Sequence, residues 1–180
     1  MNYSLPADAQ ERERFIFIVD ALTRLRIFFE IAEHPAAHTM EECKVPERLL
    51  GGVMPKNLFL RPRRQEEFYL CVTRPDAVFR TSSISRQAGA SRLGFASEEE
   101  LVRIMHARAG AAGPLSLLFE EAKDVHLLID ESLRDEPRLI FHPCENTHSV
   151  AISNEDFFGR LLPAMGHTPK FVALEASTDK

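Results

Sequence analysis

The chain has 180 residues, of which 44% are hydrophobic and 27% charged, and its formal net charge is -5. These values are typical of one globular domain with an ordinary core, and we take residues 1–180 as a single domain. They exclude a membrane-spanning helix, because no apolar run reaches the roughly 20 residues that a bilayer requires. The negative net charge also disfavours a protein that coats DNA.

Capping pairs and apolar periodicity predict the elements of the first half of the chain. Asp8 followed by Glu11 is typical of a helix start, and Thr39 with Glu42 predicts a second, short helix that Pro46 ends. The expected elements are a helix over residues 8–25, a strand over 26–33, the short helix after residue 39, and strands near 56–61 and 67–73.

The second half alternates short strands with single helices. Ser97 with Glu100 and Ser153 with Asp156 cap two of these helices. The expected elements are helices over 82–88, 97–106 and 153–165, a loop over 110–114, and strands near 93–96, 125–130, 138–142, 148–152 and 171–174. Residues 120–136, with seven carboxylates, are expected to form a solvated hairpin. Because many connections are too short for helical crossovers, we expect an α+β fold with a mixed, largely antiparallel sheet.

One stretch of the chain is clearly cationic. Between Arg48 and Arg64 there are five basic residues and no acidic one, and a Gly-Gly pair and a proline deliver Lys56 and Asn57 to the start of an apolar strand. Local positive charge suits a ligand that carries phosphate. A positively charged surface turn is the alternative interpretation.

The run Met54-Pro55-Lys56-Asn57-Leu58-Phe59-Leu60-Arg61 resembles the signature of the free-standing prolyl-tRNA editing deacylases. These are relatives of the YbaK-type deacylases and of the editing domain inserted in bacterial prolyl-tRNA synthetase. Four further segments fit the family in order: Glu33-His34-Pro35-Ala36 with Thr39, Leu93-Gly94-Phe95-Ala96-Ser97, Gly110-x-x-x-Pro114, and Phe141-His142-Pro143 with Asn146-Thr147. The resemblance covers about residues 8–167 and implies a curved sheet surrounded by helices.

The resemblance also implies roles for particular residues. Lys56 would be essential, holding the terminal adenosine phosphate or the substrate carbonyl, and Asn57 would orient the ester. The substrate-binding residues would be Gly110, Gly113, Pro114 and Leu115 of the glycine-proline loop, with His142 and His34. Acceptor-stem phosphates would meet Arg61, Arg63 and Arg64. The partner would be the acceptor end of mischarged tRNA(Pro), with prolyl-tRNA synthetase as a further candidate, in the cytoplasm.

Editing has a physical reason. A synthetase pocket built for proline rejects the smaller alanine poorly, since a missing methylene is worth only about 1–3 kcal/mol, and a second site that excludes proline by size completes the selection. The Lys-Asn-Leu-Phe-Leu-Arg form resembles the alanine-clearing branch. However, Gly113-Pro114-Leu115-Ser116 departs from the common family pattern, so alanine and cysteine both stay open as substrates. The rival functions are a non-catalytic module that binds aminoacyl-tRNA and a hydrolase of small esters or amides.

The sequence offers little for metal or cofactor chemistry. Pro35 disfavours a helix that would bring His34 and His38 to one face, and no Walker or dinucleotide-binding motif occurs. The other histidines (His38, His106, His126, His148 and His167) are expected to be ordinary surface or strand residues. The three cysteines are widely spaced, which favours a reducing cytoplasm over a disulfide framework. We therefore expect no metal and no cofactor.

Overall fold

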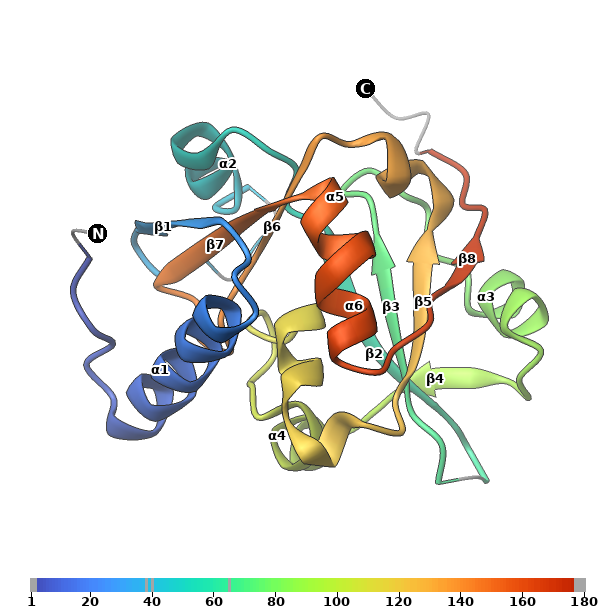
Figure 1. Ribbon diagram of the computed structural model, residues 1–180. Helices are drawn as coiled ribbons and strands as arrows, with labels where there is room; N and C mark the ends of the chain where they lie inside the picture. Colours follow the sequence, from blue (N-terminus) through green and yellow to red (C-terminus); the bar gives the residue numbers. More distant parts are fainter. Residues whose placement is uncertain (1–2, 38, 40, 65, 177–180) are drawn as a thin grey trace.

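Eight strands form two sheets in the computed structural model, which describes residues 3–37, 39, 41–64 and 66–176 (Figure 1). The smaller sheet is antiparallel, in the order β1 (Phe29–Glu33), β7 (His148–Ser153), β6 (Arg138–Phe141). The larger sheet has the order β4 (Leu93–Phe95), β2 (Lys56–Pro62), β3 (Tyr69–Thr73), β5 (His126–Asp130), β8 (Lys170–Val172). Strand β5 runs parallel to β3 and β8, and the other pairs are antiparallel. The mixed, largely antiparallel α+β fold is therefore confirmed.

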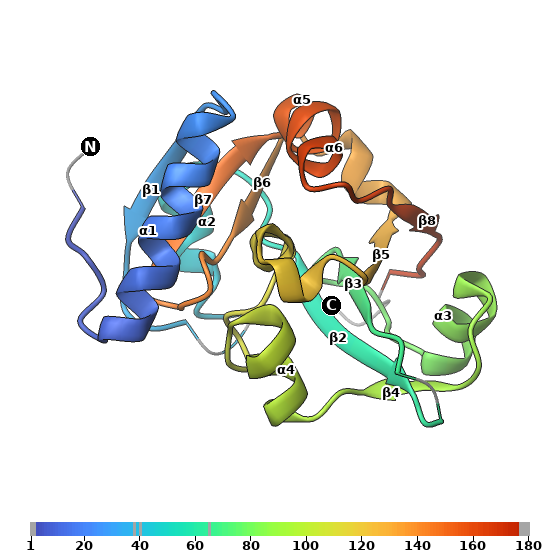
Figure 2. The same cartoon turned by 60° about the horizontal axis from the view of Figure 1, so that its bottom comes forward.

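Helices pack on the sheets at both ends of the molecule. Figure 1 shows α1 beside the smaller sheet and the α5–α6 segment beside β3. In Figure 2 the two sheets flank the chain that follows α4. The α-helices are α1 (Ala9–Arg24), α2 (Lys44–Leu50), α3 (Thr81–Ala88), α4 (Glu98–Met105), α5 (Asn154–Asp156) and α6 (Leu162–Ala164). A π-helical turn η4 (Phe157–Leu161) joins α5 to α6, and short 3-10 helices are η1 (Pro114–Leu118), η2 (Glu120–Ala122) and η3 (Glu131–Asp135).

Local capping explains where several helices begin. The Asp8 carboxylate accepts hydrogen bonds from the N–H groups of Gln10 and Glu11, both at 2.9 Å. Ser97 Oγ accepts the N–H of Glu100 at 3.2 Å, while the Glu100 carboxylate accepts the N–H of Ser97 at 2.8 Å. Each pair satisfies N–H groups that a helix start leaves without an intrahelical partner.

Two expectations about local structure are wrong. Pro46 does not end a helix but lies in the first turn of α2, which continues to Leu50. Proline is tolerated there because the first N–H groups of a helix have no intrahelical acceptor. Residues 120–136 do not form a hairpin either, since β5 in their middle is a mostly buried strand paired in parallel with β3 and β8.

The larger sheet is buried on both faces, which explains the continuous apolar sequence of β3. Leu70 and Val72 face the main core, which they share with Ile18 of α1. Tyr69 and Cys71 face a second core on the other side of the sheet. A third, smaller core lies under α2 and comprises Ala37, Cys43, Leu50, Met54, Ile140 and Ala151.

Val53 joins the two sheets. Its N–H donates to the carbonyl of Arg138 at 3.1 Å, and its carbonyl accepts the N–H of Ile140 at 2.9 Å. The chain thus leaves the edge of β6 and, three residues later, begins β2 of the larger sheet at Lys56. This crossing point sets the position of Lys56 between the sheets.

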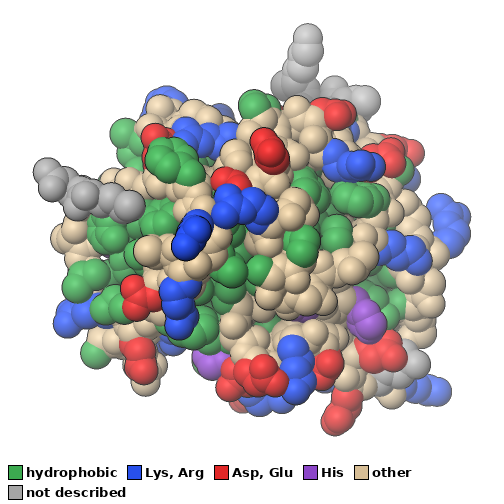
Figure 3. All heavy atoms as spheres, viewed as in Figure 1, with side chains coloured by type: hydrophobic (Ala, Val, Ile, Leu, Met, Phe, Trp, Pro, Cys, Tyr) green, Lys and Arg blue, Asp and Glu red, His purple; other side chains and the backbone are tan. Residues whose placement is uncertain are grey.

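The surface carries charges of both signs, as the 27% of charged residues in the sequence indicates. Lys and Arg side chains are interspersed with Asp and Glu on the face drawn in Figure 3. Among the residues that the structure describes, no helix has both the length and the apolar character needed to cross a membrane.

Candidate active site

A pocket of about 160 Å³ opens at the crossing point between the two sheets. Four of its residues were singled out from the sequence: Lys56, Asn57, Gly110 and His142. The others, which sequence patterns did not indicate as pocket residues, are Ala37, Thr39, Cys43, Met54, Pro55, Leu58 and Ala112. Three of these also belong to the core under α2, so that core forms an apolar floor for the pocket.

Lys56 and Asn57 supply polar groups to the pocket from the first two positions of β2. Lys56 is half-buried and forms no ion pair with any residue that the structure describes. Asn57 Nδ2 has only a long contact, 3.4 Å, to the carbonyl of Pro55. Its buried Oδ1 has no hydrogen-bond partner within the described part of the chain. Such an unpaired buried amide oxygen is costly unless a ligand satisfies it.

The glycine loop contacts Asn57 directly. Gly110 has φ 85°, a left-handed conformation that favours glycine, and it lines the pocket. A Cβ atom added to Gly113 would lie 3.2 Å from Asn57 Nδ2, so the missing side chain permits this close approach. Gly113 contributes through this approach and is not itself a lining residue. Pro114 and Leu115 do not line the pocket either. They are buried in η1, and Leu115 belongs to the main core, so they anchor the loop from behind.

His142 enters the pocket from the loop between β6 and β7. Its Nδ1 lies 2.9 Å from the carbonyl oxygen of His148 and 3.3 Å from Ser149 Oγ. Because a carbonyl only accepts, Nδ1 carries the proton in this arrangement. His34 lies behind it, with ring centroids 5.7 Å apart. The His34 nitrogens contact Ser149 Oγ and the Pro35 carbonyl, both at 2.8 Å, and His34 is not part of the pocket lining.

A buried ion pair supports the loop that carries His142. His148 Nδ1 lies 2.9 Å from Glu145 Oε1, and Glu145 Oε2 accepts the N–H of Thr147 at 2.7 Å. Burial by itself would raise the pKa of Glu145, but hydrogen bonds from His148 and Thr147 outweigh it and lower that pKa. Burial likewise opposes the charge on His148, yet Glu145 raises the pKa of His148. His148 is thus a strand histidine, as expected, but a buried and paired one; His38 lies outside the described residues.

Cys43 brings a thiol to the pocket floor. Burial raises the pKa of this thiol, and the nearby charges of Glu47 and Glu42 raise it further. A thiol rather than a thiolate is a poor nucleophile. Within the described residues, no cluster of three or more His, Cys, Asp or Glu side chains could hold a metal ion.

The three arginines expected to meet tRNA lie away from the pocket. Arg61 is five residues along β2 from Lys56, about 17 Å at the usual rise of a strand. It pairs with Glu100 and lies over the ring of Phe68, 5.7 Å from the centroid. Arg63 and Arg64 are exposed in the turn after β2. Their contact with a tRNA stays a prediction.

Comparisons with known proteins agree on one family. A family model described as an aminoacyl-tRNA editing domain matches residues 34–159. The prolyl-tRNA editing protein ProX of Acetoanaerobium sticklandii is 29% identical over 157 residues, which cover 87% of this chain and 95% of that protein. The prolyl-tRNA synthetase associated domain-containing protein 1 of Danio rerio is 31% identical over 156 residues, 86% of this chain and 84% of the other.

A solved structure shares the fold. It is described as a candidate trans-editing enzyme for prolyl tRNA synthetase and aligns with a TM-score of 0.70 at 16% identity. The alignment covers 97% of this chain and 100% of that one.

Proposed function

We propose a substrate and a mechanism for this chain, which belongs to the aminoacyl-tRNA editing domain family. The protein is an aminoacyl-tRNA deacylase, a hydrolase of an ester bond, and it edits mischarged tRNA(Pro) in trans. The proposed aminoacyl group is alanine. The observation that supports this most is the small pocket with an apolar floor, where Lys56 has no described ion-pair partner and Asn57 has an unsatisfied amide oxygen.

Size supports alanine as the group that is cleared. The pocket, at about 160 Å³, is well below the roughly 300–1,000 Å³ of pockets that enclose drug-sized ligands. Its floor is made by Ala37, Cys43 and Met54, and Ala112 adds a further small side chain to the lining. A side chain of one methyl group fits such a floor. We expect the larger ring of proline to fit it less well, which would supply the second step of a double sieve.

Lys56 and Asn57 are the proposed catalytic residues. A water oxygen attacks the ester carbonyl, a carbon–oxygen bond forms, and negative charge develops on the carbonyl oxygen. The Lys56 ammonium, at a pocket whose described lining includes no carboxylate, holds this charge or the adjacent phosphate. The bond to the ribose oxygen then breaks, that oxygen takes a proton, and free alanine leaves the tRNA. Activation of the water is assisted by the substrate's own ribose hydroxyl.

The other pocket groups position the ester. Asn57 Oδ1 accepts a hydrogen bond from the substrate's α-amino group or ribose hydroxyl, which would satisfy this oxygen. Gly110 and Gly113 allow the substrate and Asn57 to approach the backbone closely. His142, held by His148 and Ser149, closes the side of the pocket toward the smaller sheet. No cofactor takes part in this mechanism.

The test is deacylation of Ala-tRNA(Pro), Cys-tRNA(Pro) and Pro-tRNA(Pro) by the wild type and by Lys56→Ala. For the wild type we expect rapid loss of alanine and slow loss of proline. For Lys56→Ala we expect little activity on any of the three esters, with a circular dichroism spectrum like that of the wild type. Faster loss of cysteine would keep the reaction and change the substrate. If all three esters survive, the hydrolytic proposal fails and a module that only binds aminoacyl-tRNA replaces it.

A further inference from the structure

A second hollow, of about 480 Å³, lies between α1 and the segment that follows α4. It is lined by Gln10, Glu13, Arg14 and Phe17 of α1 and, across from them, by His106 and Phe119. The four α1 residues are spaced three or four apart in pairs, so they form one face of the helix. We call this hollow the α1 groove. It contains no residue of the Lys56 pocket.

Three stacked rings form one side of the α1 groove. The rings of Phe17 and Phe119 are 4.7 Å apart with an interplanar angle of 26°, and those of His106 and Phe119 are 4.3 Å apart at 22°. Phe17, at the outer end, is 37% exposed. A ladder of aromatic rings with an exposed end is a platform on which an unpaired nucleobase can stack, because every base presents a π-face.

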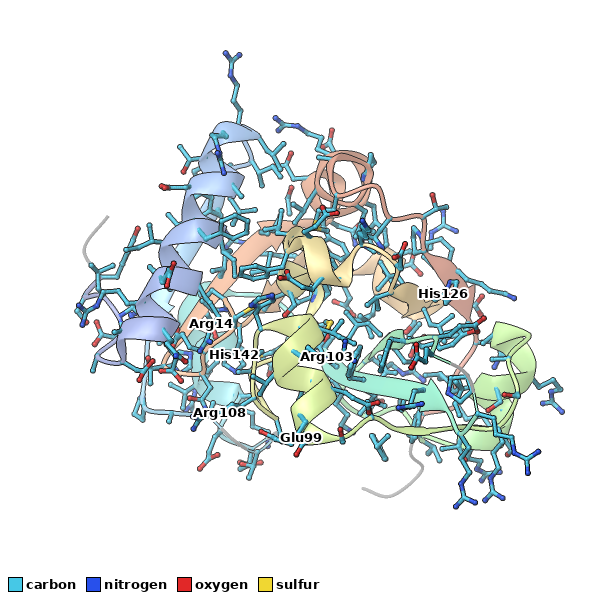
Figure 4. The ribbon with its side chains drawn as sticks, turned by 90° about the horizontal axis from the view of Figure 1, so that it is seen from below. Arg14, Glu99, Arg103, Arg108, His126 and His142 are labelled. Atoms are coloured by element: carbon cyan, nitrogen blue, oxygen red, sulfur yellow. The ribbon has the colours of Figure 1, made fainter. Side chains whose placement is uncertain are left out.

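The charges around the ladder suit a nucleotide. Neither Arg14 nor Arg108 forms an ion pair with a described residue, and both act on the Asp8 carboxylate from a distance. Figure 4 shows Arg14 and Arg108 in the same part of the underside as His142. Two carboxylates also face the α1 groove region: Glu121, which lies 2.9 Å from His106 Nε2, and Glu13.

One segment of the chain contributes to both the α1 groove and the Lys56 pocket. His106 and Phe119 stand at the two ends of the segment 107–118, and Gly110 and Ala112 of this segment line the pocket. Because one segment of chain lines both hollows, an RNA strand that delivers its 3′ aminoacyl ester to the pocket could lay the preceding nucleotides along the α1 groove.

We propose that the α1 groove binds the unpaired 3′ strand of the tRNA, with one of the cytidines that precede the terminal adenosine stacked on the Phe17–Phe119–His106 ladder. Glu13 accepts a hydrogen bond from the cytosine amino group, as carboxylates do in base recognition. Arg14 and Arg108 face the adjacent phosphates. This inference rests on the proposed function, which supplies the RNA. It also gives the Glu13 carboxylate a role beside the Phe17–Phe119–His106 ladder.

Kinetics on two substrates test the proposal. The variants are Phe17→Ala and Glu13→Gln, with Ile16→Ala as the matched control. Ile16 is also on α1 and is 41% exposed, close to the 37% of Phe17, but it does not line the α1 groove. On Ala-tRNA(Pro) we expect Phe17→Ala to raise KM by about fivefold or more, the effect of losing one stacked base, with kcat unchanged. Glu13→Gln raises KM less, and Ile16→Ala leaves it unchanged.

The second substrate is 3′-O-alanyl-adenosine, which lacks the preceding cytidines. All four proteins should hydrolyse it equally. Equal KM values for Phe17→Ala and Ile16→Ala on the tRNA would overturn the proposal, as would an equal loss by Phe17→Ala on both substrates, which would indicate a general structural defect.

Binding separates this inference from the proposed hydrolysis. An uncharged minihelix that ends in CCA, compared with the same helix lacking those three nucleotides, is titrated by fluorescence anisotropy. Weaker binding of the CCA minihelix by Phe17→Ala but not by Ile16→Ala would support the α1 groove even if the wild type hydrolysed nothing. Equal affinities of the wild type and Phe17→Ala for the CCA minihelix would overturn it.

Discussion

Lys56 and Arg61 stand near opposite ends of strand β2 and meet different surroundings. At the first end, the Lys56 ammonium has no ion-pair partner among the described residues and faces the small pocket. At the other end, the Arg61 guanidinium is engaged by Glu100 and by the ring of Phe68. Both residues belong to the same cationic stretch of sequence. A basic run thus indicates where a charged ligand could bind, whereas the partners of each cation decide which cation is available to that ligand.

Removing each cation in turn should have the largest effect and should distinguish the two ends of β2. We expect Lys56→Ala to lower kcat for Ala-tRNA(Pro) by about 100- to 1,000-fold, the usual effect of losing one group that stabilises the developing negative charge. Arg61→Ala should change kcat little and raise KM less than about fivefold, as expected for a distant phosphate contact. Single-turnover deacylation measures both. Equal losses in the two variants would contradict the distinction.

The buried pair of Glu145 and His148, behind the pocket, should stabilise the fold in a pH-dependent way. Glu145→Gln should lower the free energy of unfolding near pH 6 by about 3 kcal/mol, because it leaves a buried His148 without its counter-charge. Urea unfolding, followed by circular dichroism, measures this loss.

The sign of the pH dependence follows from the two pKa shifts. The pKa of His148 is raised above 6.5, so its contribution is complete below that pH and is lost as the pH rises through the folded-state value. The pKa of Glu145 is lowered below 4.5, so its contribution is complete above that pH and is lost as the pH falls further. The stability gap between wild type and Glu145→Gln should thus be widest between these two values. A gap that does not vary with pH would contradict a charged pair.

Two glycines, one facing each end of β2, offer a matched pair of substitutions. At Gly113 an added Cβ would crowd Asn57 at 3.2 Å, whereas at Gly94, which pairs with Arg61 at the other end, it would meet nothing within 4 Å. We expect Gly113→Ala to reduce kcat about tenfold by displacing Asn57, since small misplacements of reacting groups are costly. Gly94→Ala is the control and should retain wild-type kinetics. If the two variants behave alike, contact with Gly113 does not position Asn57.

The smallest effect is expected at Glu100. Glu100→Ala removes a partly exposed ion pair with Arg61 and one half of the capping box of α4. Together these should lower the free energy of unfolding by about 1–2 kcal/mol, with a fall in Tm of a few degrees. Deacylation of Ala-tRNA(Pro) should stay near the wild-type rate. A large loss of activity would show that this end of β2 serves the reaction more directly than its contacts indicate.

Local features of the chain were predictable because short-range forces set them. The cap of α4 involves residues three apart, and the ends of α3 and α4 fall close to where the capping and glycine signals predict them. The position of Lys56 and Asn57 at the start of β2 follows in the same way from the glycines, the proline and the apolar run around them. The wrong role for Pro46 has a local cause too: a proline in the first turn of a helix and one after its end leave similar patterns.

Long-range contacts decided the rest of the candidate site. The contact between His34 and Ser149 joins residues 115 apart in the chain, and it places His34 behind the pocket rather than in it. Leu115, expected at the substrate, is a core residue, and Cys43 and Met54 form the pocket floor. Met54 and Leu115 lie in segments that resemble the family, but the local sequence does not indicate which way their side chains face.

By itself, therefore, the sequence determined the order of the elements, the cationic run and the family. The folded arrangement was needed to show which cation is available to a ligand and which residues line the pocket. Ion pairing and burial depend on which distant segments pack together.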